Sequence, residues 1–330
     1  MDPQEELFYD AVHQRCPPEL ILNLAKQLTE VHVQFFIEQF EIAEAINPYY
    51  TKTVIKSLID NVDIFSEDET QASNRVLVIP VQDVYLTEWL FEKYIELLNV
   101  SVPSPTAKDV VQYRLDSNVR IKIEEIPRLI SGAGTTGFRT WEASLYLARY
   151  MLDYDFQGKN VLELGAGTSM VSATIAKTSG NKTNTLYITD GDTTLLETLS
   201  RRNFHLNGLI DNEKFMFRRL LWNEDPIPPN IDIVLAADVT YDASVVADLC
   251  SCLLECLSNG RCKQCLISAT IRNEDTIKAF EDQISQLKMT FKIVSSTEVD
   301  VNGALPTETL PTETLGTSLI APIRIYSIEQ

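Results

Sequence analysis

The chain has 330 residues, of which 45% are hydrophobic and 23% are charged, and its formal net charge is −19. This length is sufficient for two domains of ordinary size. No apolar run reaches the roughly 18 residues that span a bilayer, and the acidic start "MDPQEELFYD" has neither the basic nor the apolar region of a signal peptide. We therefore expect a cytosolic or nuclear protein that does not bind a membrane.

The negative charge is concentrated in the first part of the chain. Residues 1–100 contain 18 acidic and 6 basic residues, a net charge of 6 − 18 = −12. A field of this sign repels phosphate backbones, so direct binding to nucleic acid is not expected. A protein partner with a basic face is compatible with it, and so is a surface that is simply kept soluble by charge.

The first hundred residues are predicted to form an all-helical domain. Apolar residues recur at helical spacing in "PPELILNLAKQLTEV", "VQFFIEQFEIAEAI", "TKTVIKSLIDNV" and "LTEWLFEKYIELLNV". "NPYY", at 47–50, is expected to stop the second of these helices. The Pro- and Ser-rich segment 101–109 is the predicted linker. We place one domain at 1–105 and a second at 106–330.

The second domain is predicted to alternate strands with helices, which is typical of parallel βαβ units. A short hairpin is expected in "YRLDSNVRIKIEEIP". The last two strands are joined by a polar loop with the repeat "LPTETLPTET", so this pair is expected to be antiparallel. The predicted strands are 159–164, 185–190, 214–220, 231–237, 264–270, 290–299 and 320–329, and the predicted helices are 141–152, 168–179, 193–206, 243–258 and 273–288.

A glycine-rich turn follows the first strand in "VLELGAGTSM". Gly165 and Gly167 permit a tight turn and the close approach of a ligand, and Thr168 or Ser169 is expected to cap the next helix. Met170 replaces the third glycine of the dinucleotide fingerprint. Because Glu163 just before the turn would oppose a pyrophosphate, a cationic cofactor without phosphate suits this loop better.

Three further residues are candidates for binding a nucleoside cofactor. Asp190 ends the second strand and is placed to accept hydrogen bonds from both ribose hydroxyls, or else to cap a helix, a role that suits Asp192 better. Trp222 ends the third strand, where an adenine could stack on it. Trp141 begins a helix and could line the other end of the cofactor. Either tryptophan could instead be a core residue.

The residues that follow the fourth strand are candidates for the chemistry of the site. It ends in "AADVTYD", so that Asp238 and Tyr241 follow a buried strand at the edge where an α/β sheet binds its ligands. A helix cap and a packing residue are the alternative roles of this pair.

The cysteines are unevenly distributed. Cys262 and Cys265 form a C-x-x-C pair, which suggests zinc, but no second ligand pair accompanies it at suitable spacing. Cys252 and Cys256 have helical spacing among leucines, which predicts buried apolar packing. We expect no metal site.

Taken together, "TGFRTWEASLYLARYM", "VLELGAGTS", "YITD", "LLW" and "AADVTYD" resemble the seven-strand class I methyltransferases. The D-x-x-Y motif after strand four is similar to that of the eukaryotic protein-lysine methyltransferases. The helical first third is similar to the branch that methylates a lysine of translation elongation factor 2, the fungal enzymes above all. Ser169 stands where the family often has a small residue such as glycine.

The resemblance implies a Rossmann-like sheet of order 3-2-1-4-5-7-6 with strand seven antiparallel. It also implies S-adenosylmethionine as cofactor, elongation factor 2 as a protein substrate, a monomeric enzyme, and Asp238 and Tyr241 as the residues that position or enclose the lysine. Cofactor contacts are implied at seven residues: Trp141, Gly165, Ala166, Gly167, Asp190, Trp222 and Ala237.

Three alternatives remain open from the residues. The same chemistry could act on another protein, because acceptor choice depends on loops and on the N-terminal domain. A nicotinamide-dependent oxidoreductase is disfavoured by Met170. A non-catalytic binding module would have to retain the glycine turn, Asp190 and the D-x-x-Y motif without using them.

Overall fold

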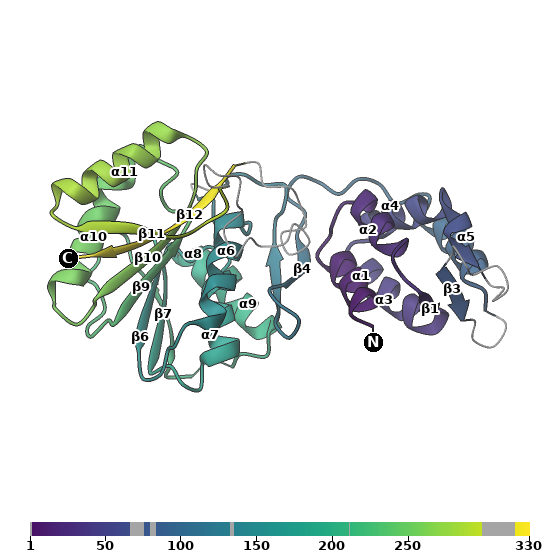
Figure 1. Ribbon diagram of the computed structural model, residues 1–330, viewed down its shortest axis with the longest axis horizontal. Coiled ribbons are helices and arrows are strands. Elements are labelled where there is room, and N and C mark those ends of the chain that lie inside the picture. Colours follow the sequence, from purple (N-terminus) through teal and green to yellow (C-terminus); the bar gives the residue numbers. More distant parts are fainter. Residues whose placement is uncertain (1, 67–75, 80–83, 133–134, 211, 299–320) are drawn as a thin grey trace. The chain divides into compact units, whose positions relative to one another are not determined.

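A computed structural model describes residues 2–66, 76–79, 84–132, 135–210, 212–298 and 321–330 (Figure 1). The chain divides into two compact units, 1–114 and 115–330. The repeat "LPTETLPTET" lies outside the described residues. None of the described helices is long and apolar enough to cross a membrane.

The N-terminal unit is built on five helices among the described residues, and an aromatic core holds them together. Phe36 and Phe40 stack with ring centroids 4.3 Å apart, and Trp89 meets Phe36 edge to face at 5.9 Å. Truncating one such buried ring to alanine costs about 3–5 kcal/mol of stability. The helices are α1 (Pro3–His13), α2 (Pro18–Ala25), α3 (Val33–Ile46), α4 (Pro48–Ile59) and α5 (Leu86–Leu97).

The prediction that this unit is entirely helical was wrong. A parallel three-stranded sheet of order β1-β3-β2 accompanies the helices, formed by β1 (Glu30–His32), β2 (Phe65–Ser66) and β3 (Val76–Ile79). The central strand has the sequence VLVI, and the alternate residues Val76 and Val78 are buried. Its β-branched side chains favour a strand, but four residues are too few to show a period.

The segment "NPYY" both ends one helix and begins the next. The side chain of Asn47 accepts a hydrogen bond from the amide of Tyr50 at 2.9 Å, and Pro48 occupies the first turn of α4. Asn47 Nδ2 also donates to Asp109 at 2.5 Å, which ties α4 to strand β4 (Asp109–Arg114). Asn followed by Pro is a typical helix start, so the segment that ends α3 also begins α4.

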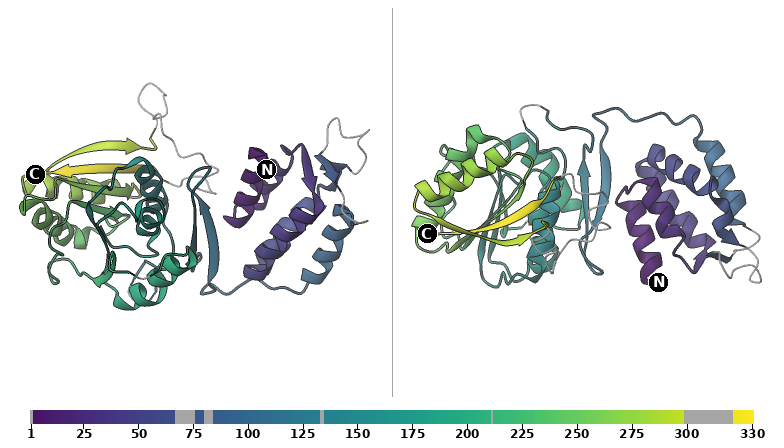
Figure 2. Two further views of the ribbon diagram at one scale, coloured as in Figure 1. Left: turned by 90° about the horizontal axis from the view of Figure 1, so that it is seen from below. Right: turned by 45° about the horizontal axis from the view of Figure 1, so that its top comes forward.

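The second unit contains a seven-stranded sheet of order β11-β12-β10-β9-β6-β7-β8 (Figures 1 and 2). Adjacent strands are parallel except where β12 pairs with β10 and with β11. Numbered along the chain from β6, the strands run 3-2-1-4-5-7-6. They are β6 (Asn160–Leu164), β7 (Thr185–Asp190), β8 (Phe215–Arg219), β9 (Ile233–Ala237), β10 (Gln264–Thr270), β11 (Thr290–Ser296) and β12 (Ile323–Glu329), preceded by β5 (Arg120–Glu125).

Helices cover both faces of this sheet. One face carries α6 (Glu142–Tyr150), α7 (Met170–Ser179) and a helical segment, 193–206, that contains a π-turn and ends in α9 (Arg201–Leu206). The other face carries α10 (Val246–Ser258) and α11 (Glu274–Gln286). The predicted helices and strands of this unit agree with the observed ones to within a few residues at each end.

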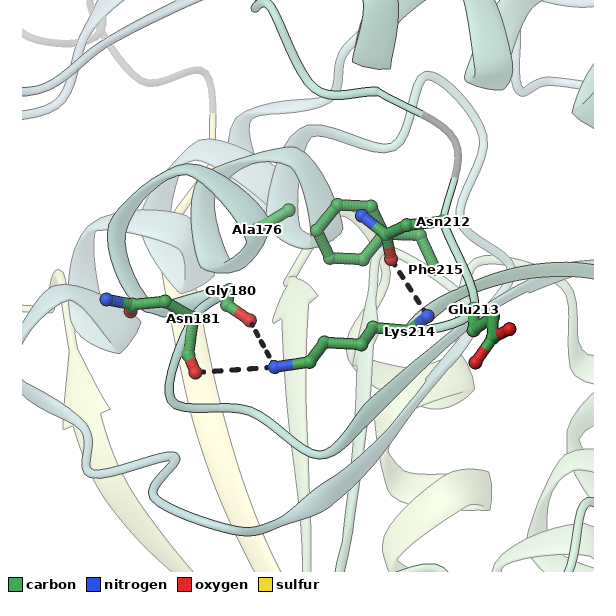
Figure 3. Close-up of a pocket in the computed structure, with 7 residues that line it drawn as sticks. All are labelled: Ala176, Gly180, Asn181, Asn212, Glu213, Lys214 and Phe215. Atoms are coloured by element: carbon green, nitrogen blue, oxygen red, sulfur yellow. Dashed lines mark hydrogen bonds between the residues drawn. The ribbon is translucent and has the colours of Figure 1, made fainter.

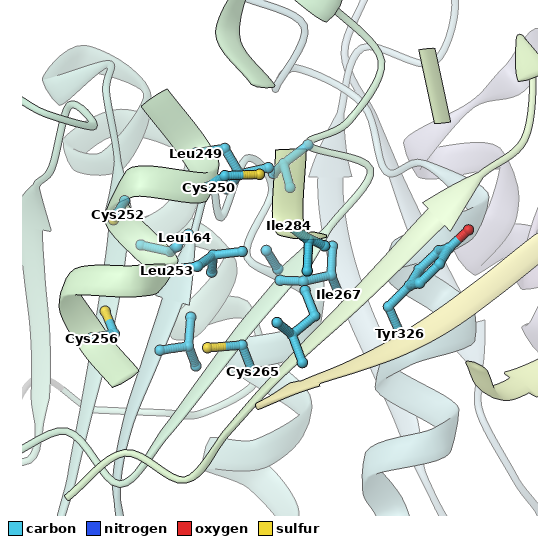
Figure 4. Packing of buried hydrophobic residues seen from close by; sticks show 14 of the residues in the cluster. Leu164, Leu249, Cys250, Cys252, Leu253, Cys256, Cys265, Ile267, Ile284 and Tyr326 are labelled. Atoms are coloured by element: carbon cyan, nitrogen blue, oxygen red, sulfur yellow. The ribbon is translucent and has the colours of Figure 1, made fainter. Parts of the chain in front are cut away.

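The cysteines of α10 and β10 pack in the apolar core (Figure 4). Cys252, Cys256, Cys262 and Cys265 are each at most 2% exposed, and none forms a disulfide. Among the residues that the structure describes, no group of three or more His, Cys, Asp or Glu side chains is arranged to hold a metal. The spacing of Cys252 and Cys256 therefore reflects packing between α10 and the sheet.

Candidate functional site

The glycine turn after β6 adopts backbone angles that favour glycine. Gly165 and Gly167 have φ of +62° and +53°. A Cβ on Gly165 would lie 2.8 Å from Cγ1 of Val239, closer than two carbon atoms can approach. The turn is therefore restricted to glycine by its own conformation and by the loop after β9.

The expected helix cap in this turn is absent. Ser169 precedes α7 with φ of +64°, and its side chain forms no capping hydrogen bond. The Thr168 hydroxyl instead pairs with the Thr140 hydroxyl at 2.9 Å. The Ser169 hydroxyl is fully buried and has no hydrogen-bond partner among the described residues. It is thus a polar group left over for a ligand in the turn.

Asp190, at the end of β7, is bonded to the glycine turn. Its carboxylate accepts the amide of Gly167 at 3.0 Å and that of Asp192 at 3.0 Å. Burial raises the pKa of Asp190 above its usual value, although these amides oppose the shift. Asp192 caps the next helix through the amides of Thr194 and Leu195, as predicted. Asp190 is therefore not that cap, and its remaining lone pairs can accept further hydrogen bonds.

Three more predicted cofactor residues lie around the same turn. The ring of Trp222 lies 3.9 Å from the position of a Cβ on Gly165 and packs partly against the core. Ala237 ends β9 beside Ser268 of β10, whose buried hydroxyl has no partner among the described residues. Ala166 has both backbone groups engaged, its amide with Thr189 and its carbonyl with Ser169. Ala166 therefore supports the conformation of the turn.

The environment of Glu163 differs from the one expected from the sequence. Its carboxyl is 3% exposed and accepts hydrogen bonds from the amide and the hydroxyl of Ser172 in α7. Burial raises the pKa of Glu163 to about 8. The burial of Glu163 and its raised pKa both weaken the expectation that its charge would repel a pyrophosphate.

A pocket of about 430 Å³ lies at the carboxyl ends of β9 and β10. It brings together three predicted site residues: Trp141, Asp238 and Tyr241. The remaining lining residues were not predicted as site residues: Ile130, Thr136, Arg139, Glu142, Thr270, Arg272 and Ala321.

Asp238 lies in this pocket as one half of an ion pair. Its side chain is 4% exposed, and its backbone has φ of +56°, which is unusual for a residue other than glycine. Arg272 donates from Nη1 to Oδ1 at 3.0 Å and from Nη2 to Oδ2 at 2.8 Å. The Thr270 amide also points at Oδ1, at 3.4 Å.

Arg272 is the main residue that sequence reasoning missed. It follows β10 by two positions, and β10 is the neighbour of β9 in the sheet. The rule that singled out Asp238, a polar residue just beyond the carboxyl end of a buried strand, applies equally to Arg272. The guanidinium carbon of Arg272 lies 4.8 Å from the ring centre of Trp141, and that of Arg139 lies 4.4 Å from it.

Trp141 and Tyr241 form two walls of the pocket. Trp141 stands at the cap position of α6, whose Ala143 and Leu147 are fully buried, and its indole N–H donates to the carbonyl of Thr136 at 3.1 Å. Tyr241 is 54% exposed, and its hydroxyl accepts a hydrogen bond from Thr136 at 3.3 Å. Tyr241 is therefore not a packing residue of the core.

A second hollow, of about 520 Å³, lies by the amino end of β8 and contains no predicted site residue (Figure 3). Lys214 Nζ donates there to the carbonyls of Gly180 and Asn181, at 3.5 and 3.3 Å. A cation beside the last carbonyls of α7 stabilises the end of that helix. This arrangement is structural.

The residues around the glycine turn fit a nucleoside cofactor. The turn offers a cradle without Cβ atoms, a buried hydroxyl without a partner on Ser169, and a carboxylate with free acceptor sites on Asp190. The adjoining pocket offers an apolar slot with an ion pair at its base, in which the Asp238 carboxylate is buried. These are the requirements of a transferase that moves a group from such a nucleoside to an acceptor in the slot.

Comparisons with known proteins agree with this chemistry. A family model described as lysine methyltransferase matches residues 120–286. The protein-lysine N-methyltransferase EFM3 of Saccharomyces cerevisiae is 43% identical over 344 residues, 99% of each chain. EFM3 of Chaetomium thermophilum is 36% identical over 48% of this chain and 50% of its own length. Human protein-lysine N-methyltransferase EEF2KMT is 27% identical over 63% and 67%.

The fold and the comparisons define a class I methyltransferase. The chain belongs to the lysine methyltransferase family. It is an S-adenosylmethionine-dependent enzyme that methylates a lysine of a protein. This identification decides against the nicotinamide-dependent oxidoreductase and the non-catalytic binding module.

Proposed function

We propose that the protein substrate is translation elongation factor 2, that the D-x-x-Y residues Asp238 and Tyr241 serve its acceptor lysine, and that the enzyme acts as a monomer in the cytosol, where translation takes place. The observation that supports the substrate is the similarity to EFM3, which extends over 99% of both chains and so includes the N-terminal unit. The relative EEF2KMT supports the same assignment by its name.

The cofactor-binding residues are proposed from the geometry around the glycine turn. S-adenosylmethionine, when bound, supplies a methyl group on a positively charged sulfur. Gly165 and Gly167 leave room for it, Asp190 accepts hydrogen bonds from its ribose, Trp222 stacks on its adenine, and Trp141 lines its methionine end. Ala237 completes the binding site with its backbone, and Ala166 contributes to the shape of the turn. In support, Asp190 is bonded to the turn, and Trp222 lies beside Gly165.

The acceptor lysine must be a neutral amine to react, whereas the pKa of free lysine is about 10.4. An apolar slot disfavours the ammonium form because it removes the charge from water. The carboxylate of Asp238 has about four lone-pair positions, and the contacts from Arg272 and Thr270 occupy three. We assign the remaining position, on Oδ2, to an N–H of the amine, which leaves the nitrogen lone pair free to attack. Tyr241 forms the wall beside it.

The N-terminal unit is proposed to grip the protein substrate. Its residues 1–100 have a net charge of −12, which favours a partner with a basic face. The outer face of α5 also exposes apolar side chains one helical turn apart: Phe91 is 45% exposed, Ile95 64% and Leu98 51%. Exposed apolar residues that share one helix face are typical of protein interaction surfaces.

The proposal is tested by incubating the purified chain with elongation factor 2 and radiolabelled S-adenosylmethionine, followed by mass spectrometry of the product. We expect methylation of one lysine, and none by Asp190→Ala. Absence of label on elongation factor 2, together with label on another cytosolic protein, would overturn the substrate assignment.

A further inference from the structure

The guanidinium of Arg272 occupies the place at Asp238 that a lysine ammonium would take. Both of its terminal nitrogens donate to the carboxylate, at 3.0 and 2.8 Å. The Asp238 side chain is 4% exposed, so the carboxylate is shielded from water, whereas the Arg272 side chain is 38% exposed. The positive guanidinium thus offsets the negative charge of the carboxylate.

An unpaired carboxylate at this position would oppose the reaction. A buried negative charge within about 4–6 Å of an amine raises its pKa. The amine would enter as an ammonium and pair with Asp238, and an ammonium has no lone pair with which to attack a methyl group. A slot that contains an aspartate therefore needs a fixed cation beside it.

We propose that Arg272 is a positioning residue whose charge on Asp238 keeps the acceptor lysine in its neutral form. The inference rests on the proposed lysine slot and adds a residue that neither the D-x-x-Y motif nor the glycine turn contains. The lysine releases its proton to water before it enters the slot, and Asp238 then orients the neutral amine as a hydrogen-bond acceptor.

The other charged groups of the pocket are consistent with this role. Arg139 pairs with Glu142 at 3.4 Å, and Arg272 Nη2 lies 3.6 Å from the same carboxylate. With Asp238, the lining then holds two guanidinium groups and two carboxylates. Removing Arg272 would leave an excess of negative charge.

The ring of Trp141 adds a second barrier to the ammonium. An aromatic face of this kind attracts cations. Here the guanidinium carbons of Arg139 and Arg272 already lie 4.4 and 4.8 Å from the ring centre. A lysine ammonium would meet two like charges at this wall, whereas a neutral amine would not.

The experiment is the pH dependence of kcat, which reports the ionisation of the bound acceptor when elongation factor 2 and S-adenosylmethionine are saturating. The variants are Arg272→Met and Asp238→Asn. Loss of the guanidinium should move the midpoint of the profile upward by about one to two pH units. Loss of the carboxylate should move it downward, because the unpaired guanidinium then faces the amine.

The opposite signs separate a charge effect from a structural one, since damage to the pocket would lower kcat at every pH without moving the midpoint. Arg272→Lys keeps a cation beside Asp238, so the midpoint of its pH profile should lie close to that of the wild type. The matched control is Arg261→Met, which removes an arginine that pairs in the same two-bond manner with Asp232, at 2.7 and 3.2 Å, near the amino ends of the strands. Its midpoint should equal that of the wild type.

An unmoved midpoint in Arg272→Met would overturn the inference. Arg272→Met could fail to fold because it leaves Asp238 unpaired. In that case Asp238→Asn is the test, and an unmoved midpoint in Asp238→Asn would also overturn the inference. Failure of the wild type to methylate elongation factor 2 would contradict the proposed substrate instead. Methylation with unshifted midpoints would contradict this inference alone.

Discussion

The amide of Gly167 donates to Oδ2 of Asp190 at 3.0 Å, which links the turn after β6 to the end of β7. The second carboxylate oxygen accepts the amide of Asp192 at 3.0 Å. One side chain thus shapes the glycine turn and, in our proposal, binds the ribose.

Replacing Asp190 with alanine should weaken the binding of S-adenosylmethionine at least about tenfold, because each hydrogen bond to a charged group contributes about 1.5–3 kcal/mol. Calorimetric titration of the purified protein measures this. Asp192→Ala is the matched control. It removes a helix cap, costs about 1 kcal/mol of stability, and should leave the dissociation constant unchanged. Equal affinities for wild type and Asp190→Ala would rule out the ribose assignment.

Asp238→Ala should bind the cofactor normally and lose methyl transfer by about a hundredfold or more, because the amine loses its acceptor and its alignment. Single-turnover transfer to elongation factor 2 measures the chemical step, and calorimetry measures cofactor binding. Asp242→Ala, which removes an exposed aspartate that caps the next helical turn, should keep its activity. Wild-type turnover in Asp238→Ala would mean that the lysine is held elsewhere.

Glu163 should make the stability of the protein depend on pH. Burial raises its pKa from 4.5 to about 8 in the folded state, so the folded protein binds the proton more tightly than the unfolded chain. The stabilisation from the protonated carboxyl is fully present below pH 4.5, declines as the pH rises, and is lost above about 8. The slope cannot exceed about 1.4 kcal/mol per pH unit.

Denaturant unfolding of the wild type and of Glu163→Gln, measured from pH 5 to 9, tests this dependence. The glutamine keeps an oxygen that can accept from Ser172 and does not titrate, so its free energy of unfolding should fall less over this range. Parallel curves for the two proteins would show that Glu163 ionises as it does in water.

The double change Phe91→Ser and Ile95→Ser, on the outer face of α5, should raise KM for elongation factor 2 severalfold and leave kcat unchanged. Both side chains are exposed, at 45% and 64%, so the core of the unit is not disturbed. Ile210→Ser, at an apolar residue of the second unit that is 79% exposed, is the control and should behave as the wild type. Steady-state kinetics decide, and an unchanged KM would mean that this face does not contact the substrate.

Local patterns were sufficient for the strands and helices of the second unit. The glycine turn, the acid at the end of β7 and the acid after β9 could be related because parallel strands end at one edge of a sheet. The cap at Asp192 and the packing of Cys252 and Cys256 also follow from short-range rules. The three strands of the first unit did not follow, since strands of two to four residues carry no periodic signal.

The amino-acid sequence alone determined the class of fold, the glycine turn after β6 and the placement of Asp238 just beyond β9, because each depends on residues close together in the chain. Only the tertiary structure decided that Arg272, 34 positions away, pairs with Asp238, and that Glu163 is enclosed by α7. Charge and protonation depend on which groups meet in space and on how much water reaches them. Neither quantity is encoded in the spacing of residues along the chain.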